Sequence, residues 1–168
     1  MCIRDSYRTG PVTISGSIYP PPGPESVPVK MAEFGRWLSD ISVPADDAFA
    51  GVEGFFAAAV AHTWLVTVHP FVDGNGRMAR LLMNLLLMRH GYPIAIVTKE
   101  DRLRYYDALE FSQACDLTPF VVLVAECIKE SLKEYEAAAK EQREQIGWAT
   151  SLAQRFTQPE RIRSTRGE

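Results

Sequence analysis

The chain has 168 residues, of which 46% are hydrophobic and 23% charged, and its formal net charge is −3. These values are typical of one globular domain with a loose tail. The negative net charge argues against a general nucleic-acid binder, and no apolar run is long enough to span a bilayer. We therefore expect neither nucleic acid nor a membrane as a partner.

The three cysteines, Cys2, Cys115 and Cys127, form neither a metal-binding spacing nor a convincing disulfide framework. The N-terminus also lacks the pattern of a signal peptide. Both observations favour a cytoplasmic location. The opening "MCIRDSYRTG" begins without a capped element, so we expect either a fragment or six non-native residues at the start.

The first predicted element is a short β-hairpin. Residues 12–14 and 17–19 alternate β-branched and small polar side chains around a turn at Ser15-Gly16. A proline-rich connector follows over residues 20–26. Apolar residues then recur at helical spacing and predict a helix near 27–40. The next segment, "SVPADDAFAG", reads as a loop that ends at an acidic helix start.

Two apolar helices are predicted in the middle of the chain. The first covers residues 48–68, with two glycines that weaken its first turn, and residues 69–74 break it. The second covers residues 75–89 and ends at Gly91, which suits the position after a helix. It is apolar almost all round, so we expect it at the centre of a helical bundle.

The rest of the chain also reads as mainly helical. Residues 94–98 form a short extended piece, and residues 99–114 are amphipathic. Asp116 or Thr118 caps a helix that runs toward Lys140, and the polar tail beyond it suggests one more helix. The predicted fold class is mainly α with a peripheral β-hairpin. We divide the chain into an N-terminal segment, a core domain and a C-terminal tail: residues 1–26, 27–140 and 141–168.

The densest polar cluster is "HPFVDGNGRMAR", residues 69–80, directly against the second apolar helix. Backbone N–H groups of Gly74, Asn75 and Gly76, followed by Arg77, point outward at a helix N-terminus, which is an anion site. Arg77 and Arg80 are three residues apart and share one helical face. Two guanidinium groups above such a nest suit a polyphosphate.

Two further residues complete this cluster. Asp73 stands beside the nest, where an acid is better suited to Mg²⁺ than to phosphate. The ordinary pKa of His69 suits a general base near neutral pH. Taken singly, each residue could have an ordinary structural role in a turn, at a helix end or on a solvated face. The combination indicates a nucleotide-dependent transferase.

The twelve residues resemble the full signature of the Fic family, His-Pro-Phe-x-Asp/Glu-Gly-Asn-Gly/Lys-Arg-x-x-Arg. Every fixed position is present. The stretch "YRTGPVTISGSIY" resembles the β-hairpin flap of that family, and "RLLMNLLLMRHGYP" resembles the remainder of its central helix. "RYYDALEFSQACDLTPF" resembles the helix and turn that follow. The resemblance covers residues 7–135 and implies a Fic-type helical bundle.

The resemblance implies AMPylation, the transfer of AMP from ATP to a protein hydroxyl with Mg²⁺. His69 would deprotonate a Ser, Thr or Tyr of the protein substrate, Asp73 would coordinate Mg²⁺, and Arg80 would hold the γ-phosphate. The implied nucleotide site comprises Asp73, Gly74, Asn75, Gly76, Arg77, Met78, Ala79, Arg80, Tyr105, Tyr106 and Gln113. The flap, Ser15, Gly16, Ser17 and Ile18, would clamp the target by strand addition.

Some positions depart from the family or have a structural explanation. Gln113 stands where many relatives have Asn, and Cys115 where many have Gly; we expect Cys115 to be a small packing residue. Tyr105 and Tyr106 are equally well explained as packing residues. His62 is expected to pack or hydrogen-bond without a catalytic role.

Several functional alternatives remain open. The donor could carry UMP, phosphocholine or a phosphate, although phosphate transfer goes with Lys in place of Gly76. Removal of AMP and a catalytically silent interaction domain are the others. The family's inhibitory pattern, Ser/Thr-x-x-x-Glu-Gly/Asn, fails at Glu53-Gly54 and is incomplete at Ser164–Glu168. An inhibitory segment, a separate antitoxin chain and a homodimer are the partners considered besides the substrate.

Overall fold

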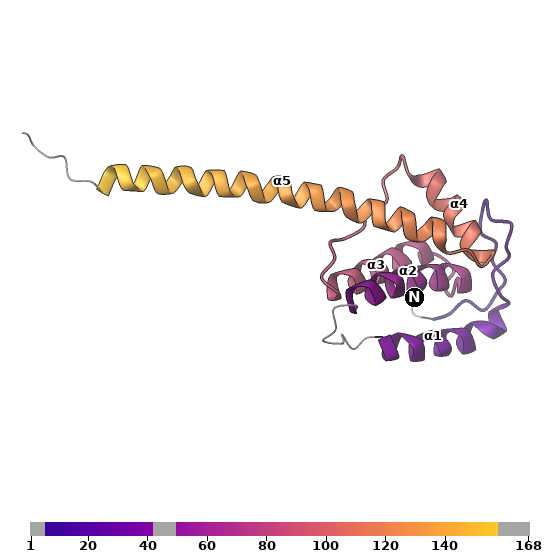
Figure 1. Cartoon of the computed structure of the whole chain (residues 1–168). Coiled ribbons are helices and arrows are strands. Elements are labelled where there is room, and N and C mark those ends of the chain that lie inside the picture. Colours follow the sequence, from indigo (N-terminus) through magenta and orange to yellow (C-terminus); the bar gives the residue numbers. More distant parts are fainter. Residues whose placement is uncertain (1–5, 42–49, 158–168) are drawn as a thin grey trace, which may run out of the picture. The chain divides into compact units, whose positions relative to one another are not determined.

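The computed structural model describes residues 6–41 and 50–157, which form helices joined by short loops (Figure 1). The elements, in chain order, are a 3-10 helix η1 (Pro24–Ser26), α1 (Val27–Ile41), α2 (Ala50–Val68), α3 (Asn75–Arg89), α4 (Arg102–Gln113) and α5 (Thr118–Thr157). The predicted mainly α class is confirmed. The predicted loop over 42–49 and the sequence pattern at Ser164–Glu168 lie outside the described residues.

The chain divides into two compact units, Met1–Ser131 and Leu132–Glu168. The first unit contains a hydrophobic core and every residue predicted for the site. The described part of the second unit is the remainder of α5. Among the described residues, no helix combines the length and apolar character needed to cross a membrane.

The core of the first unit is built on α2 and α3, which lie side by side (Figure 1). The start of α2 meets the end of α3, where Phe55 and Tyr92 have ring centroids 5.8 Å apart. Gly54 permits this approach, because a Cβ there would collide with the ring of His90. Buried residues of α2, α3, α4 and α5 form the centre of this core: Ala58, Ala61, Leu65, Met83, Leu87, Leu109, Phe120 and Leu123.

An aromatic cluster attaches α1 to α2. Phe34 and Trp37 of α1 have ring centroids 5.9 Å apart, and each lies 5.4 Å from the ring of Trp64 on α2. Phe34 is buried, and both tryptophans are partly buried against the core. Such aromatic pairs stabilise a fold beyond the apolar area that they remove from water. The cluster therefore holds α1 against α2.

Most helix ends follow the capping expected from sequence. Gly91 adopts φ +79°, and the bonds from its N–H to Met88 and from Tyr92 N–H to Leu87 close the end of α3. At the start of α5, the N–H of Thr118 donates to Asp116 Oδ1 at 3.0 Å. The predicted end near Lys140 is wrong, since α5 continues to Thr157. That segment is rich in Ala, Glu, Gln, Lys and Arg and has no proline to stop it.

The prediction that Cys115 is a packing residue is wrong. Cys115 is exposed and adopts φ +68° directly after α4. Its N–H donates to Ser112 O at 3.2 Å, and the N–H of Asp116 donates to Phe111 O at 3.0 Å. These two bonds form the Schellman motif, in which the left-handed position favours glycine. Cys115 therefore ends a helix instead of filling the core.

The predicted β-hairpin is also absent, because residues 6–41 contain no β-strand. The turn itself forms, with Ser17 N–H donating to Ile14 O at 3.2 Å and Gly16 at φ +86°. A positive φ at the third residue alone is the geometry of a type II turn, which splays the two arms. The N–H of Ile18 bonds to Glu110 Oε2 at 3.1 Å instead of a facing strand. The segment is a turn anchored to α4.

Residues 94–98 belong to neither a helix nor a strand. The side-chain amide of Asn84 forms hydrogen bonds with both the N–H and the carbonyl oxygen of Ala95. Its Oδ1 accepts from Ala95 N–H at 2.7 Å, and its Nδ2 donates to Ala95 O at 3.2 Å. Asn84 thus provides the two hydrogen bonds that a neighbouring strand would otherwise supply.

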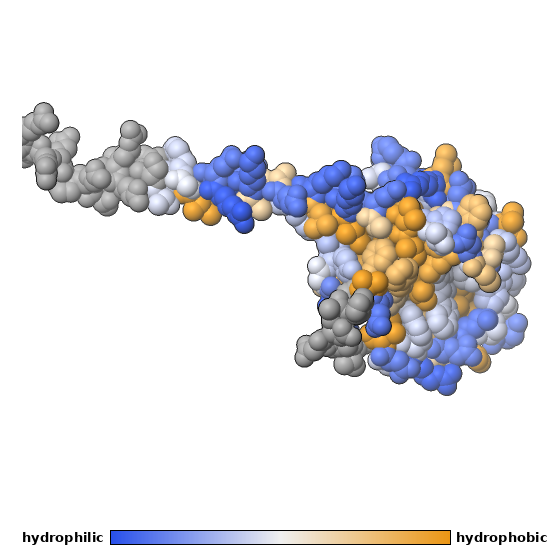
Figure 2. Space-filling view, in the orientation of Figure 1, coloured by the Kyte–Doolittle hydropathy of each residue, from blue (hydrophilic) through white to orange (hydrophobic). Residues whose placement is uncertain are grey.

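The expectation that α3 lies at the centre of a bundle holds for only one of its faces. Ala79, Met83, Leu86 and Leu87 face the core, whereas a second row along α3 is exposed: Met78, Leu81, Leu85 and Met88. Figure 2 shows apolar residues gathered on the face of the first unit over α2 and α3. An apolar run in a sequence indicates that both sides of a helix are apolar, and it does not tell whether both sides are covered.

Candidate active site

The predicted site residues surround one cavity of about 540 Å³, a size typical of small-molecule sites. Three segments of the first unit form its walls: the turn at residues 14–17, the loop that leads from α2 into α3, and α4. The residues that line it are Ile14, Ser15, Gly16, Ser17, Val66, His69, Val72, Asp73, Gly74, Asn75, Gly76, Arg77, Arg80, Leu103, Tyr105, Tyr106, Asp107, Leu109, Glu110 and Gln113.

Three predicted site residues do not line this cavity. Ala79 is fully buried in the core, and Met78 borders a smaller neighbouring cavity with Leu81. Ile18 is 80% exposed beyond the turn. All the other predicted residues line the cavity.

His69 follows the last residue of α2 and has φ +49°, an unusual backbone conformation for a non-glycine residue. Its N–H still donates to Leu65 O at 3.0 Å, so it closes the last turn of the helix. Its Nδ1 lies 3.2 Å from Val66 O. Burial lowers the pKa of His69, the carbonyl of Val66 opposes that shift, and the charge of Arg8 adds to it. The imidazole is therefore neutral near pH 7, as a general base must be.

A buried arginine holds the backbone on which His69 sits. Arg8 is 3% exposed, and its Nε donates to His69 O at 2.8 Å. The backbone N–H of Arg8 donates to Pro70 O at 2.9 Å. Its guanidinium also donates to Gly10 O and to Pro22 O. Arg8 thus ties the end of α2 to the N-terminal segment, and its positive charge suits the negative end of that helix.

The loop before α3 is closed by the side chain of Asn75. This side chain is 2% exposed. Its Oδ1 accepts from Phe71 N–H at 2.9 Å and its Nδ2 donates to Phe71 O at 2.8 Å. Asn75 therefore holds the loop in shape and can offer a ligand only its backbone N–H.

The N-terminus of α3 faces the cavity without a side-chain cap. Gly74 precedes the helix with φ +87° and ψ +4°, and no side chain bonds to the first turn. The first N–H groups of any α-helix lack intrahelical partners. Those of Asn75, Gly76 and Arg77 are therefore available to an anion at the positive end of the helix dipole.

Of the two arginines in the site, Arg77 pairs weakly with a carboxylate and Arg80 contacts an aromatic ring. Arg77 and Asp73 form an ion pair of 3.0 Å, with side chains 59% and 76% exposed. An exposed pair of this kind contributes at most about 1 kcal/mol, so a ligand can rearrange it. Arg80 lies over the ring of Tyr105, with its guanidinium carbon 6.0 Å from the ring centroid.

The two tyrosines of α4 differ in exposure. Tyr105 is 5% exposed, and its hydroxyl lies 3.1 Å from Nε2 of His62. Tyr106 is 47% exposed and contacts Arg102, whose guanidinium carbon lies 5.6 Å from the ring centroid. Only Tyr106 therefore offers an open aromatic surface at the cavity.

Sequence reasoning missed two residues that organise the site. Glu110 lines the cavity and anchors the turn through Ile18 N–H. Arg8 holds the backbone of His69, and its sequence signal was only a basic residue two positions before a glycine. The expectation that His62 packs or hydrogen-bonds is confirmed, since it is buried and contacts the hydroxyl of Tyr105. Glu110 gave no signal, because its partner is 92 residues away.

The protein side chains of the site could bind Mg²⁺ only together with oxygen atoms of a bound ligand. Among the described residues, no group of three or more His, Cys, Asp or Glu side chains could hold a metal ion. Asp73 is an exposed carboxylate at the cavity wall beside the N-terminus of α3. Mg²⁺ is commonly held by one or two carboxylates together with substrate phosphates and water. Asp73 fits such a role beside a bound polyphosphate.

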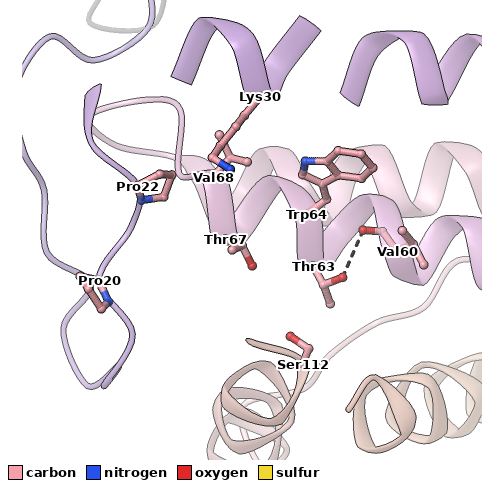
Figure 3. A pocket seen from close by; sticks show the side chains of 9 residues that line it. All are labelled: Pro20, Pro22, Lys30, Val60, Thr63, Trp64, Thr67, Val68 and Ser112. Atoms are coloured by element: carbon pink, nitrogen blue, oxygen red, sulfur yellow. Dashed lines mark hydrogen bonds between the residues drawn. The ribbon is translucent and has the colours of Figure 1, made fainter. Parts of the chain in front are cut away.

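A second cavity of about 400 Å³ lies on another side of α2 (Figure 3). It is lined by Trp64, Thr67 and Lys30, by Pro20 and Pro22 of the connector, and by Ser112 of α4. The hydroxyl of Thr63 in its wall donates to Val60 O at 3.1 Å (Figure 3). This cavity contains none of the predicted site residues.

Comparison with known proteins supports the interpretation of this motif. The Fic/DOC family model matches residues 3–87. Protein adenylyltransferase Fic from Drosophila melanogaster is 41% identical over 140 residues, which cover 83% of this chain and 27% of that protein. The same protein from Drosophila erecta is 40% identical with the same coverage. The chain thus spans about a quarter of the length of these relatives.

Solved structures show the same fold. Fic-1 (residues 134–508) from C. elegans aligns with a TM-score of 0.66 and 38% identity, covering 82% of this chain and 38% of that one. A Fic domain-containing signaling protein from Bacteroides thetaiotaomicron aligns with a TM-score of 0.65 and 29% identity, covering 81% and 55%. The family match, the relatives and the shared fold agree, and the chain belongs to the Fic/DOC family.

Proposed function

We propose that this chain is the catalytic domain of a protein adenylyltransferase, which transfers AMP from ATP to a Ser, Thr or Tyr hydroxyl of a protein substrate. One observation carries the proposal: a neutral histidine and the uncapped N-terminus of a helix with two arginines line the same cavity. The relatives named protein adenylyltransferase support the same reaction.

The proposed step is an in-line displacement at the α-phosphorus. Nε2 of His69 accepts the proton of the target hydroxyl, whose oxygen forms a bond to the α-phosphorus. The bond from that phosphorus to the oxygen that bridges to the β-phosphate breaks, and pyrophosphate leaves. The imidazolium then returns its proton to solvent. The bond from Nδ1 to Val66 O supports this role, since it leaves Nε2 free to accept.

The phosphates would lie at the start of α3. Backbone N–H groups of Asn75 and Gly76 suit the α- and β-phosphates, Arg77 the β-phosphate and Arg80 the γ-phosphate. Asp73 would hold Mg²⁺, which when bound neutralises phosphate charge. The weak ion pair between Asp73 and Arg77 supports this assignment. Breaking it costs little, so Asp73 can bind the metal and Arg77 the phosphate instead.

The adenosine would lie against α4, and the target would lie against the turn that is anchored to this helix. The open ring of Tyr106 can stack on the base, and Gln113 offers an amide to its edge. The turn formed by Ser15, Gly16 and Ser17 would contact the target segment. Its anchor on Glu110 supports a fixed position for that turn.

Transfer is tested with the purified chain, Mg²⁺ and ATP labelled on the α-phosphate, with self-modification and added cell lysate as acceptors. We expect label on protein with the original sequence and with His90→Ala, which changes a histidine at the far end of α3. His69→Ala should lose the label. Equal labelling of the His69→Ala and unchanged proteins would contradict the assignment of the base.

Intact-mass analysis identifies the group that is transferred. A gain equal to AMP on an acceptor protein supports the proposal, whereas a gain equal to UMP, phosphocholine or phosphate when those donors are supplied would replace it. If no group is transferred and Mg-ATP fails to raise the melting temperature, the proposed function is wrong.

A further inference from the structure

A histidine lies inside the core of the first unit, where the proposed reaction does not use it. His62 of α2 is fully buried. Its ring stacks on Phe120 of α5 with centroids 4.7 Å apart, and it meets the edge of Tyr105 at 5.7 Å. Its Nε2 lies 3.1 Å from the hydroxyl of Tyr105. Three helices therefore hold this imidazole in one orientation.

His62 is an unfavourable choice if its role is packing alone. Its Nδ1 is buried and has no hydrogen-bond partner within the described part of the chain. An unpaired buried polar atom destabilises a fold, and an apolar side chain of similar volume would avoid that cost. The surroundings are apolar apart from the Tyr105 hydroxyl. The one contact that a phenylalanine could not reproduce is the hydrogen bond to Tyr105.

That hydrogen bond reaches the proposed phosphate site through one more residue. The guanidinium carbon of Arg80 lies 6.0 Å from the centroid of the Tyr105 ring. A cation over an aromatic face is attracted to it, and the hydroxyl of the same ring lies 3.1 Å from Nε2 of His62. The three side chains therefore form one series of contacts from the core to the cavity.

His62 stays neutral in this place, because burial, followed by the charge of Arg80, lowers its pKa to about 3. A neutral imidazole can hydrogen-bond to the Tyr105 hydroxyl without adding a second positive charge near the guanidinium. Arg80 and Tyr105 are the charged and titratable groups that contact this ring in the described structure.

Arg80 has few other groups to orient it. Neither ion pair described within residues 6–41 and 50–157 includes Arg80. Its guanidinium lies over the ring of Tyr105. An arginine that must meet a phosphate in one geometry benefits from a fixed neighbour that does not compete for its charge.

We propose that His62 is a positioning residue: its hydrogen bond to the Tyr105 hydroxyl fixes the ring over which Arg80 lies, and so holds the guanidinium at the phosphate end of the cavity. This inference rests on the proposed function, in which Arg80 binds the γ-phosphate of ATP. It predicts that His62 affects binding of the γ-phosphate and leaves binding of the α- and β-phosphates unchanged.

The test compares dissociation constants for Mg-ATP and Mg-ADP by calorimetry, because ADP lacks the γ-phosphate. His62→Phe keeps an aromatic ring and removes the acceptor. We expect its affinity for ATP to fall about tenfold, the usual size of one charge-assisted contact, and its affinity for ADP to stay within about twofold. His62→Gln, which can place an acceptor near the position of Nε2, should recover most of the ATP affinity.

Tyr105→Phe removes only the oxygen and tests the same link if His62→Phe does not fold. It should show the same selective loss for ATP, and combining it with His62→Phe should add little. Thermal unfolding without nucleotide confirms that each variant is folded. Equal losses for ATP and ADP, or unchanged ATP affinity in folded His62→Phe and Tyr105→Phe, would overturn the inference.

Arg80→Ala separates this inference from the proposed function. If the unchanged chain prefers ATP over ADP and Arg80→Ala removes the preference, the phosphate assignment stands whatever His62→Phe does. If Arg80→Ala binds both nucleotides as the unchanged chain does, the proposed role of Arg80 fails, and the inference about His62 fails with it.

Discussion

The Nδ1 atom of His69 lies 3.2 Å from the carbonyl oxygen of Val66, three residues earlier at the end of α2. A neutral imidazole carries one proton, and a carbonyl oxygen can only accept. The pair therefore places that proton on Nδ1 and the lone pair on Nε2. The last turn of a helix selects the tautomer that a general base requires.

The first prediction concerns the pH dependence of transfer. In the proposed reaction the neutral form of His69 is the active one, and burial lowers its pKa below the ordinary value of 6.5. Activity should therefore persist as pH falls through 6.5 and be lost only below it. Measurement of kcat/KM against pH reports this pKa for the free enzyme. Calorimetric affinities for Mg-ATP over the same range remove the contribution of phosphate protonation. A midpoint above 6.5 would contradict the prediction.

Substitution of Arg8 should impair both stability and catalysis. Arg8→Met leaves the carbonyls of His69, Gly10 and Pro22 without their donor in a buried place. We expect unfolding free energy to fall by about 2–4 kcal/mol in urea denaturation. Activity at a temperature where the variant is still folded should fall at least about tenfold, because the backbone that aims His69 is released.

Arg36→Met on the exposed surface of α1 is the matched control. It should change stability by less than about 0.5 kcal/mol. Similar results for the two substitutions would mean that the hydrogen bonds of Arg8 do not stabilise the site.

Gly76→Ala should separate ligand binding from folding. A Cβ at this position would meet only Nη1 of Arg80, at an ordinary 3.6 Å, so the free protein should keep its fold and gain up to about 1 kcal/mol of helix stability. The same methyl group would stand where phosphates approach the backbone, and affinity for Mg-ATP should fall about tenfold or more. Gly35→Ala, in open space on α1, should leave affinity unchanged. Unaltered affinity in Gly76→Ala would place the phosphates elsewhere.

Cys115→Gly should stabilise the protein without altering the cavity. Cys115 holds φ +68° after α4, a conformation that costs a non-glycine residue about 1 kcal/mol. Relief of that strain should outweigh the greater freedom of glycine in the unfolded chain and raise the melting temperature by a few degrees. Ala114→Gly, at φ −81°, is the control and should lower it. A fall in melting temperature for Cys115→Gly would show that no strain is stored there.

The site could be predicted from sequence because its main residues are local. Twelve consecutive positions contain the proposed base, the acid, the glycines and both arginines, and α3 begins at Asn75 as its composition indicated. Local hydrogen bonding and helix periodicity determine such segments. The helix over residues 27–41 followed from the same kind of signal.

The features that were missed depend on contacts between distant residues. The arms beside Gly16 show the alternation of a hairpin, yet Ile18 bonds to Glu110, 92 residues away. Arg8 and His69 are 61 residues apart. The exposed row on α3 was missed for a related reason, since apolar composition says nothing about which neighbours are present. Sequence periodicity describes one element, whereas these features arise from the packing of several.

The two hydrogen bonds between Asn75 and Phe71 have a consequence for how a nucleotide is bound. Because they already close the loop in the free protein, the loop loses little freedom when a ligand arrives, and little binding energy is used to order it. The loss of conformational entropy that orders this loop occurs when the chain folds. Since Asn75 is also the first residue of a core helix, opening the loop means fraying α3. The proposed phosphate site is thus as stable as the fold, and on heating the two should unfold in a single cooperative transition.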